Sequence, residues 1–426
     1  MLKQLIRAVL EYYTKVFFRR HHPILIVVVG AVGKTTTKHA IYQVLKRHYR
    51  VRMEPTNLNS ELSVPLSILG VEYPSNRVLR NPLAWLGVIW RVFLAAYRKC
   101  SVDIIIQELA TDHPGDIANF GRYLSADIAV VTAVADEHME NFADGIDAVA
   151  NEELSVCRFA KTVILNSSAV NKKYFSMIKQ EKFITYGFDM GDYHFSKVVG
   201  RPLSGYNVVI DHIKATVSLL GKHNMQSIAA AVAVGRELGL SDALIAKGIE
   251  SLVPVPGRMN CLTGKRNSLI IDDTYNSSPI AAVAALDTLY SIKVKHRIAV
   301  LGSMNELGTF SAAAHDLVGK HCDPKCLDLV VTIGEAANKD LACAAERAGC
   351  KVVRFDKSSD AGKYVCSYMH KTMDQDSSKA ILVKGSQNGV FAEEAVKQLI
   401  RDRKDSSKLV RQSRDWIERK AKAHSL

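Results

Sequence analysis

The chain has 426 residues and a formal net charge of +13, with 48% hydrophobic and 23% charged residues, so it is long enough for two or three domains with their own cores. No uninterrupted apolar run reaches the roughly 20 residues of a membrane span, and the first residues lack the pattern of a secretory signal, which together favour a cytoplasmic protein. The charge is compatible with anionic ligands, but no zinc-finger spacing or aromatic and basic cluster supports nucleic acid as a partner.

The first segment, residues 1–23, is predicted to be an amphipathic helix. Apolar residues recur three and four positions apart from Leu2 to Phe17, with Lys3 and Glu11 on the opposite side. Residues 81–99 form a second apolar segment with aromatic and basic residues. Packing on the core or on a second copy of the chain is the favoured interpretation of both segments. Weak, salt-sensitive contact with an anionic membrane is the alternative.

The next segment predicts a phosphate site. The apolar run 26–29 indicates a buried strand, and a helical pattern at 38–45 follows a glycine-containing loop. Such a loop brings backbone N–H groups and a helix N-terminus close to an anion. Lys34 would reach the outer phosphates and Thr35 a magnesium ion. The predicted nucleotide ligands of the loop are Gly30, Ala31, Val32, Gly33, Lys34, Thr35 and Thr36.

The match to this motif is incomplete, because Val28 stands where a full Walker A motif has glycine. The alternative is an ordinary strand-to-helix turn with a solvated lysine. The apolar strand, the Gly-Lys pair and three threonines together favour an ATP site.

Strand and helix patterns then alternate along the chain. Apolar strands are predicted at 102–109, 126–134 and 162–166, and a helix at 223–240, which indicates a parallel sheet with helices on both faces. Two prolines and a glycine near residue 255 suggest a boundary. Five further strands are predicted at 268–275, 296–302, 327–334, 350–356 and 380–386. We expect an α/β protein with a P-loop NTPase-like domain at 24–255 and a smaller Rossmann-like domain at 256–426, whose basic tail from Arg401 forms a solvated helix.

Eight further motifs, taken in order with the loop, resemble the Mur ligase family, and most closely its MurF-type ligases, which add D-alanyl-D-alanine to the peptidoglycan precursor. The resemblance covers residues 24–400. The motifs occupy 54–69, 107–117, 135–142, 221–227, 256–260, 272–279, 300–308 and 382–388.

The resemblance implies ATP and Mg²⁺ and assigns roles to individual residues. Glu108, which ends a predicted strand, would bind magnesium, as a carboxylate suits this cation; the alternative is a solvated strand-end glutamate. His138 would ligate a second magnesium, although a lone histidine is often structural. Arg258 would approach the γ-phosphate, Asn276 would contact adenine, and one of Asp272 and Asp273, here taken as Asp273, would contact ribose. Asn59, Lys384 and Ser386 are the candidate substrate residues.

The sequence also departs from the family pattern. Relatives carry a carbamylated lysine about 15 residues after the histidine, whereas this segment reads "DAVANEELSVC", so that Glu153, or Glu152 without a one-residue insertion, would take its place. Ser303 and Gln387 stand where aspartate and arginine are usual, which leaves the amine substrate open. Only about 23 residues precede the first strand, too few for the UDP-binding domain of MurF-type ligases.

These features predict an ATP-dependent ligase that activates a carboxylate as an acyl phosphate and joins it to an amine. Its substrates would be a small-molecule or peptide acceptor and an amino acid or dipeptide. A ligase for another acceptor, as in folate and polyglutamate elongation, is the alternative within this class. A nucleotide-binding scaffold without ligase activity is the alternative outside it. The oligomeric state is not predicted.

Overall fold

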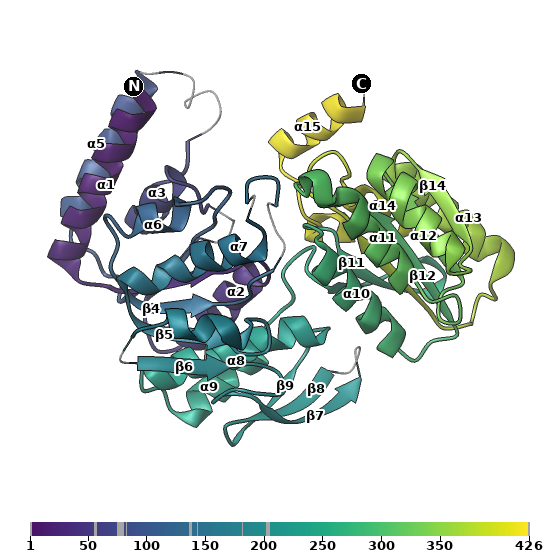
Figure 1. Ribbon diagram of the computed structural model, residues 1–426, viewed down its shortest axis with the longest axis horizontal. Helices are drawn as coiled ribbons and strands as arrows, with labels where there is room; N and C mark the ends of the chain where they lie inside the picture. The colour runs from purple at the N-terminus through teal and green to yellow at the C-terminus, as the bar shows by residue number, and fades with distance from the viewer. Residues whose placement is uncertain are drawn as a thin grey trace.

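The computed structural model describes residues 2–54, 58–74, 81, 83–135, 139–142, 144–180, 182–201 and 205–424. Figure 1 shows two lobes, each built around a six-stranded sheet. We call the lobe with strands β1 to β6 the first lobe and the lobe with β10 to β15 the second lobe. None of the helices within the described ranges has the length and apolar character needed to cross a bilayer.

The sheet of the first lobe is parallel throughout, in the order β2-β3-β1-β4-β5-β6. Its central strands are runs of β-branched and aliphatic residues buried on both faces, as expected for a sheet covered by helices. The pairing of Val28 with Glu108 brings the carboxyl ends of β1 and β3 together. The strands are β1 Ile24–Val29, β2 Val51–Met53, β3 Ile104–Glu108, β4 Ala126–Val131, β5 Ala160–Asn166 and β6 Lys182–Tyr186.

Helices cover both faces of this sheet, which confirms the predicted α/β class. One face packs against α1 Leu2–His21, α3 Ser63–Leu69, α5 Ala84–Tyr97, α6 Asp116–Phe120 and α7 Ile146–Glu153. The other face packs against α2 Lys34–Leu45, α8 Lys222–Glu237 and α9 Asp242–Glu250. This second group also covers a three-stranded antiparallel sheet that the sequence did not predict, formed by β7 Phe195–Arg201, β8 Gly205–Ile210 and β9 Ile213–Val217.

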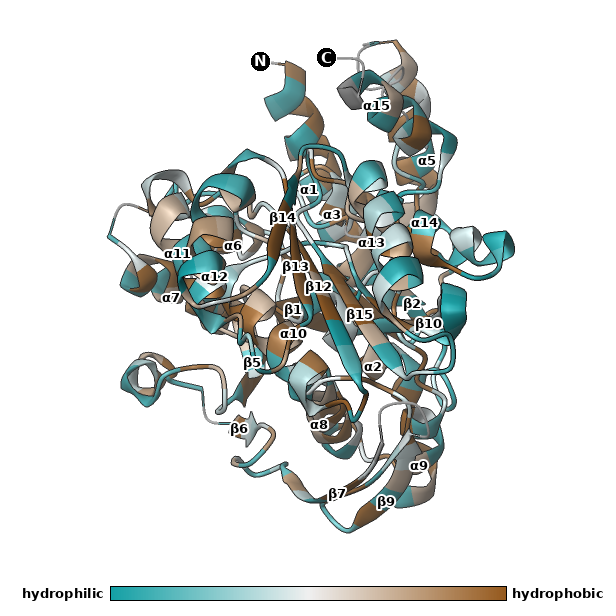
Figure 2. Cartoon of the chain, turned by 90° about the vertical axis from the view of Figure 1, so that its right-hand side faces the viewer, coloured by the Kyte–Doolittle hydropathy of each residue, from teal (hydrophilic) through white to brown (hydrophobic). Residues whose placement is uncertain are grey.

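The sheet of the second lobe has the order β10-β11-β15-β12-β13-β14, and only β10 is antiparallel. Figure 2 shows its strands as apolar and the outer sides of the flanking helices as more polar. The strands are β10 Asn260–Thr263, β11 Leu269–Asp273, β12 His296–Gly302, β13 Leu329–Ile333, β14 Val352–Phe355 and β15 Lys379–Lys384. The helices are α10 Pro279–Ser291, α11 Ser311–His321, α12 Ala342–Arg347, α13 Ser358–Thr372, α14 Glu393–Leu399 and α15 Arg414–His424.

Short helical segments complete the chain. Five are single 3-10 turns or short runs, and one is a π-helical turn that leads into α12. The 3-10 segments are Leu154–Phe159, Lys172–Met177, Lys265–Asn267, Gly308–Phe310 and Arg403–Lys408, and the π-helical turn is Ala337–Leu341.

The C-terminal tail is not simply a solvated helix, and this corrects the prediction from its composition. Lys420 in α15 is only 4% exposed, because its ammonium forms ion pairs with Glu393 (3.0 Å) and Glu394 (2.6 Å). The carboxylates that pair with Lys420 come from α14, outside the tail. The composition of the tail alone therefore could not predict this burial.

Candidate active site

The glycine loop lies between β1 and α2 and depends on two residues without side chains. At Gly30 the backbone has φ +122°, and an added Cβ would overlap Thr132 and the backbone of Ala133. Gly33 has φ +90° and caps the N-terminus of α2. Both conformations favour glycine. The first turn of α2 therefore points toward whatever the loop binds, and Lys34 closes over the loop by donating to the carbonyl oxygens of Gly30 (2.5 Å) and Ala31 (3.0 Å).

Glu108 lies next to this turn at the end of β3. Its side chain is 3% exposed and accepts a hydrogen bond from the Thr35 hydroxyl (3.1 Å) and forms an ion pair with Lys38 (3.2 Å). Burial raises the pKa of this carboxyl, but the positive charges of Lys38, Lys34 and Arg258 outweigh burial and lower the pKa overall. Glu108 is therefore an ionised carboxylate beside a hydroxyl, a donor set that suits Mg²⁺.

Glu152 and Glu153 face different partners, although they are neighbours in α7. The Glu153 carboxylate is 2% exposed and accepts the backbone N–H of Gly30 (2.8 Å). The Glu152 carboxylate accepts the backbone N–H groups of Gly115 and Ile117, each at 2.6 Å, at the start of α6. Of the two candidates for the replaced lysine, Glu153 is the one that lies at the phosphate loop.

The second lobe contributes a cation and an aromatic ring. The Arg258 guanidinium lies 4.1 Å from the centre of the Tyr275 ring. Its Nε is buried, and no described residue accepts its hydrogen bond. A buried donor without a partner is costly, so this arginine is suited to an anionic ligand.

Asp273 and Lys384 form an ion pair across neighbouring strands. Lys384 Nζ lies 2.7 Å from Asp273 Oδ2 and also donates to the carbonyl oxygen of Asn276 (3.0 Å). This pair fixes the turn that carries Asn276. The adjacent Asp272 is fully buried and accepts hydrogen bonds from Thr274 and from Gly257 N–H, and burial raises its pKa to about 6. The structure thus places Asp273, not Asp272, at the surface of the site.

These groups face one cavity of about 590 Å³ between the two lobes. It lies at the carboxyl ends of parallel strands of both sheets, the usual place for ligands in open α/β sheets. Residues of the first lobe supply the phosphate loop and the carboxylate, and residues of the second lobe supply the arginine and the Asp273–Lys384 pair. Among the predicted residues, the lining contains Ala31, Val32, Gly33, Lys34, Thr35, Thr36, Asn59, Glu108, Arg258, Asp273, Asn276 and Lys384.

Three of the described residues predicted for the site are absent from this lining: Gly30, Glu153 and Ser386. Gly30 and Glu153 are joined by the hydrogen bond from Gly30 N–H. Ser386 is 1% exposed and lies behind the wall, where its hydroxyl accepts the backbone N–H of Asn305 and contacts the carbonyl oxygen of Ser277. His138 lies outside the described residues. Within the described ranges, no three or more His, Cys, Asp or Glu side chains gather as a metal cluster.

The structure also adds residues that the sequence motifs did not reveal. Lys38 is 1% exposed and lies one helical turn after Lys34 on α2, a spacing that could have suggested a shared face. Arg411, from the C-terminal tail, donates to the carbonyl oxygens of Thr274 (2.5 Å) and Tyr275 (2.9 Å) and pairs with the buried Glu393 (2.6 Å). It therefore braces the loop that carries Tyr275 and Asn276.

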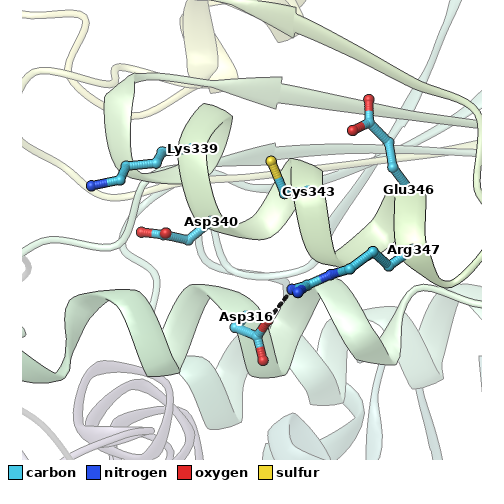
Figure 3. Close-up of a pocket in the computed structure, with 6 residues that line it drawn as sticks. All are labelled: Asp316, Lys339, Asp340, Cys343, Glu346 and Arg347. Carbon is cyan, nitrogen blue, oxygen red and sulfur yellow. Dashed lines mark hydrogen bonds and ion pairs between the residues drawn. The ribbon is translucent and has the colours of Figure 1, made fainter.

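A second hollow of about 560 Å³ lies in the second lobe, between α11 on one side and the π-helical turn and α12 on the other (Figure 3). Charged side chains line it, and Asp316 and Arg347 pair across it at 2.6 Å. It shares no lining residue with the cavity between the lobes. The phosphate loop and Glu108 line the cavity between the lobes and not this hollow.

Comparison with known proteins gives matches in both lobes. The family model for the Mur ligase middle domain matches residues 90–235, and the model for the Mur ligase glutamate ligase domain matches residues 257–387. A UDP-N-acetylmuramoyl-tripeptide--D-alanyl-D-alanine ligase from Synechocystis is 28% identical over 380 residues, which cover 88% of this chain and 74% of the relative.

Solved structures share the fold. A crystal structure of MurF from Acinetobacter baumannii is similar with a TM-score of 0.75 and 22% identity, covering 92% of this chain and 79% of that chain. Folylpolyglutamate synthase from Mycobacterium tuberculosis, complexed with ADP and AMPPCP, is similar with a TM-score of 0.66 and 17% identity, covering 91% of this chain and 94% of that chain.

Proposed function

The chain belongs to the Mur ligase family, and we propose that it is an ATP-dependent ligase that joins a carboxylate to an amine through an acyl phosphate. More specifically, we propose that the reaction is MurF-like and takes place in the cytoplasm, in the synthesis of a peptidoglycan precursor or a related cell-wall peptide. The relatives named as D-alanyl-D-alanine ligases support this version.

One observation carries the proposal: the cavity between the lobes combines a phosphate loop from the first lobe with Arg258 from the second, whose buried Nε has no hydrogen-bond acceptor among the described residues. Lys34 and Arg258 both line it, so a nucleotide in it would meet cations from both lobes. Phosphoryl transfer needs mainly positioning and neutralisation of charge. Glu108 and Thr35 are the described residues suited to hold Mg²⁺, which would supply further positive charge when bound.

The proposed reaction has two steps. An acceptor carboxylate oxygen attacks the γ-phosphorus of ATP, so that ADP leaves and an acyl phosphate forms. The amine nitrogen then attacks the acyl carbon, phosphate leaves, and the amine proton passes to solvent. Lys34 and Arg258 would stabilise the transferring phosphoryl group, and Glu153 would fix the loop through Gly30 N–H.

A smaller hollow offers a route for the acceptor. It has a volume of about 390 Å³ and shares Asn59, Ala110 and Asp112 with the lining of the main cavity. Lys3 of α1 and His113 stand on its other sides. We infer that the acceptor carboxylate reaches the γ-phosphate from this side, and that the amine enters from the side of the second lobe near Lys384.

We further propose that the chain divides into an N-terminal helix (1–23), a central ATP-binding domain (24–255) and a C-terminal domain (256–426). The division assigns the phosphate loop and Glu108 to one domain and Arg258, Asp273 and Asn276 to the other. Catalysis would then depend on the closed arrangement of the two domains.

The test is ATP-dependent product formation. The protein is incubated with ATP and Mg²⁺ and with either a UDP-muramyl tripeptide and D-alanyl-D-alanine or a folate and glutamate, and phosphate release and product mass are followed. The proposal expects phosphate release that requires both an acceptor and an amine. Lys34→Ala should abolish it, whereas Lys46→Ala, an exposed lysine at the other end of α2, should not.

The same assay separates the alternatives. Product only with folate and glutamate would favour polyglutamate-type elongation, a possibility supported by the 94% coverage of the folylpolyglutamate synthase chain. Nucleotide binding without release of phosphate with any acceptor and amine would favour a scaffold and contradict the ligase proposal.

A further inference from the structure

Helix α5 is apolar on two opposite sides, and only one of them is covered. Trp85, Val88 and Val92 are buried against the first lobe. On the other side, Leu86 and Trp90 are 64% and 60% exposed, and Leu83, which immediately precedes the helix, is 75% exposed. A helix that is apolar all round is normally buried on every side. The exposed apolar side of α5 is therefore a candidate interaction surface.

Helix α1 extends this exposed apolar surface. It lies beside α5 in Figure 1, and the two helices project together from the first lobe. The Trp90 ring stacks on Phe93 (5.3 Å between centroids), Phe93 meets Tyr13 edge-on (6.0 Å), and Tyr13 meets Tyr12 (5.2 Å). These contacts join exposed residues of both helices into one patch. We call it the α1–α5 surface, and its exposed apolar members are Leu2, Leu5, Tyr12, Leu83, Leu86, Trp90 and Tyr97.

This concentration is particular to the two helices. Among the described residues, 15 large hydrophobic side chains are classed as exposed, and seven of them belong to the α1–α5 surface. Single exposed apolar residues are normal, whereas contiguous patches mark interaction sites.

The charge around the patch has one sign. Residues 2–21 and 83–99 contain eight Lys or Arg and one carboxylate, Glu11. Arg7 pairs with Glu11 and with Glu61. The exposed Arg19, Arg98 and Lys99 have no carboxylate partner among the described residues. The surface is therefore apolar and aromatic in its centre and cationic at its margins.

We propose that the α1–α5 surface docks the protein on an anionic lipid membrane. Tryptophan and tyrosine favour the boundary between headgroups and acyl chains, helices with apolar and basic sides lie flat in this boundary, and the unpaired cations match the charge of anionic headgroups. The protein would lie on the membrane, with its ligand cavity open to the solvent between the lobes. This inference does not depend on the proposed ligase activity.

Co-sedimentation with vesicles tests the proposal on the full chain. Vesicles of phosphatidylcholine alone and of phosphatidylcholine mixed with phosphatidylglycerol are compared at low and high salt. The protein should pellet with the anionic vesicles at low salt, less at high salt, and not with the neutral vesicles. Leu86→Glu should lower the partition coefficient by on the order of tenfold or more, and Arg98→Glu by roughly five-fold or more.

Matched controls lie in the second lobe. Leu317 on α11 is 52% exposed, and Lys371 on α13 is exposed. Leu317→Glu makes the same change as Leu86→Glu, and Lys371→Glu makes the same reversal of charge as Arg98→Glu. Both lie away from the patch and should leave binding unchanged. Circular dichroism and Tm establish that each variant is folded. If Leu86→Glu does not fold, the result for Arg98→Glu decides the outcome.

Three results would overturn the proposal. The first is wild-type protein that stays in the supernatant with anionic vesicles at low salt. The second is loss of binding in the second-lobe controls equal to that in the α1–α5 variants. The third is a wild-type protein that binds no vesicle and forms a dimer in light scattering, where Leu86→Glu is a monomer. The patch would then contact a second copy of the chain.

Discussion

Replacing Glu153 by glutamine removes a buried negative charge from behind the phosphate loop while keeping an oxygen that can accept the Gly30 N–H. The variant should therefore keep most of its thermal stability and lose activity. We expect kcat to fall at least about tenfold, which corresponds to about 1.4 kcal/mol of activation free energy. The result would indicate that the charge of Glu153, and not its shape, serves the reaction.

The neighbouring Glu152→Gln variant should show the opposite pattern. Its carboxylate accepts two backbone N–H groups at 2.6 Å, and an amide can accept only one of them and would turn its NH₂ group toward the other. A charge-assisted hydrogen bond contributes about 1.5–3 kcal/mol, so Tm should fall by roughly 4–10 °C. The activity of the folded enzyme should change less than in Glu153→Gln.

The assay compares Tm and steady-state phosphate release for the wild type and both variants, in buffer with and without bicarbonate. Wild-type activity should not depend on bicarbonate, because no carbamate has to form on a glutamate. Glu153→Lys should gain a requirement for bicarbonate if position 153 is the one that the family fills with a carbamylated lysine. Near-normal kcat in Glu153→Gln would refute the argument, and so would a bicarbonate requirement in the wild type.

Three further outcomes are expected. Lys34→Ala should lose on the order of 3 kcal/mol of transition-state stabilisation in phosphate release while the fold is retained, and a loss of only a few-fold would contradict the ATP site. Arg411→Ala should lower Tm, because it leaves the buried Glu393 with one cation instead of two. It should also raise the KM for ATP, because it removes the hydrogen bonds that hold the Thr274 and Tyr275 carbonyls. Arg411→Lys should recover part of both losses, and an unchanged KM would show that these hydrogen bonds do not serve nucleotide binding. The pKa of Asp272 is raised to about 6 in the folded protein, so its contribution to stability is full below about pH 4 and is lost as pH rises through about 6. Asp272→Asn should therefore flatten the fall in Tm between these pH values. Parallel Tm profiles for the variant and the wild type would refute this assignment.

The parts of the fold that followed from the sequence are those with a strong local pattern. The strands of both parallel sheets are uninterrupted apolar runs, because both of their faces are buried. Gly30 and Gly33 were recognisable because positive φ and close backbone approach restrict these positions to glycine. Glu108 could be placed because a parallel strand ends there, at the edge where ligands bind.

The rest depends on contacts between segments that are distant in sequence. Strands β7 to β9 contain polar residues among their apolar ones, so none of them is an uninterrupted apolar run that would predict their antiparallel sheet. The choice between Glu152 and Glu153 depends on the rotation of α7, since neighbouring residues on a helix point about 100° apart. The burial of Lys420 depends on carboxylates of α14. This contact can be recognised only from the folded structure, in which the tail packs against α14.

The cavity between the lobes has a consequence for how the protein unfolds. A nucleotide that contacts Lys34 on one lobe and Arg258 on the other binds fully only while both lobes are native. Mass action then adds about 2.7 kcal/mol of stability at a ligand concentration one hundred times Kd, and this gain is lost when either lobe melts. Two lobes that could unfold in separate steps would thereby become a single cooperative unit, so that the width and number of calorimetric transitions report on nucleotide occupancy.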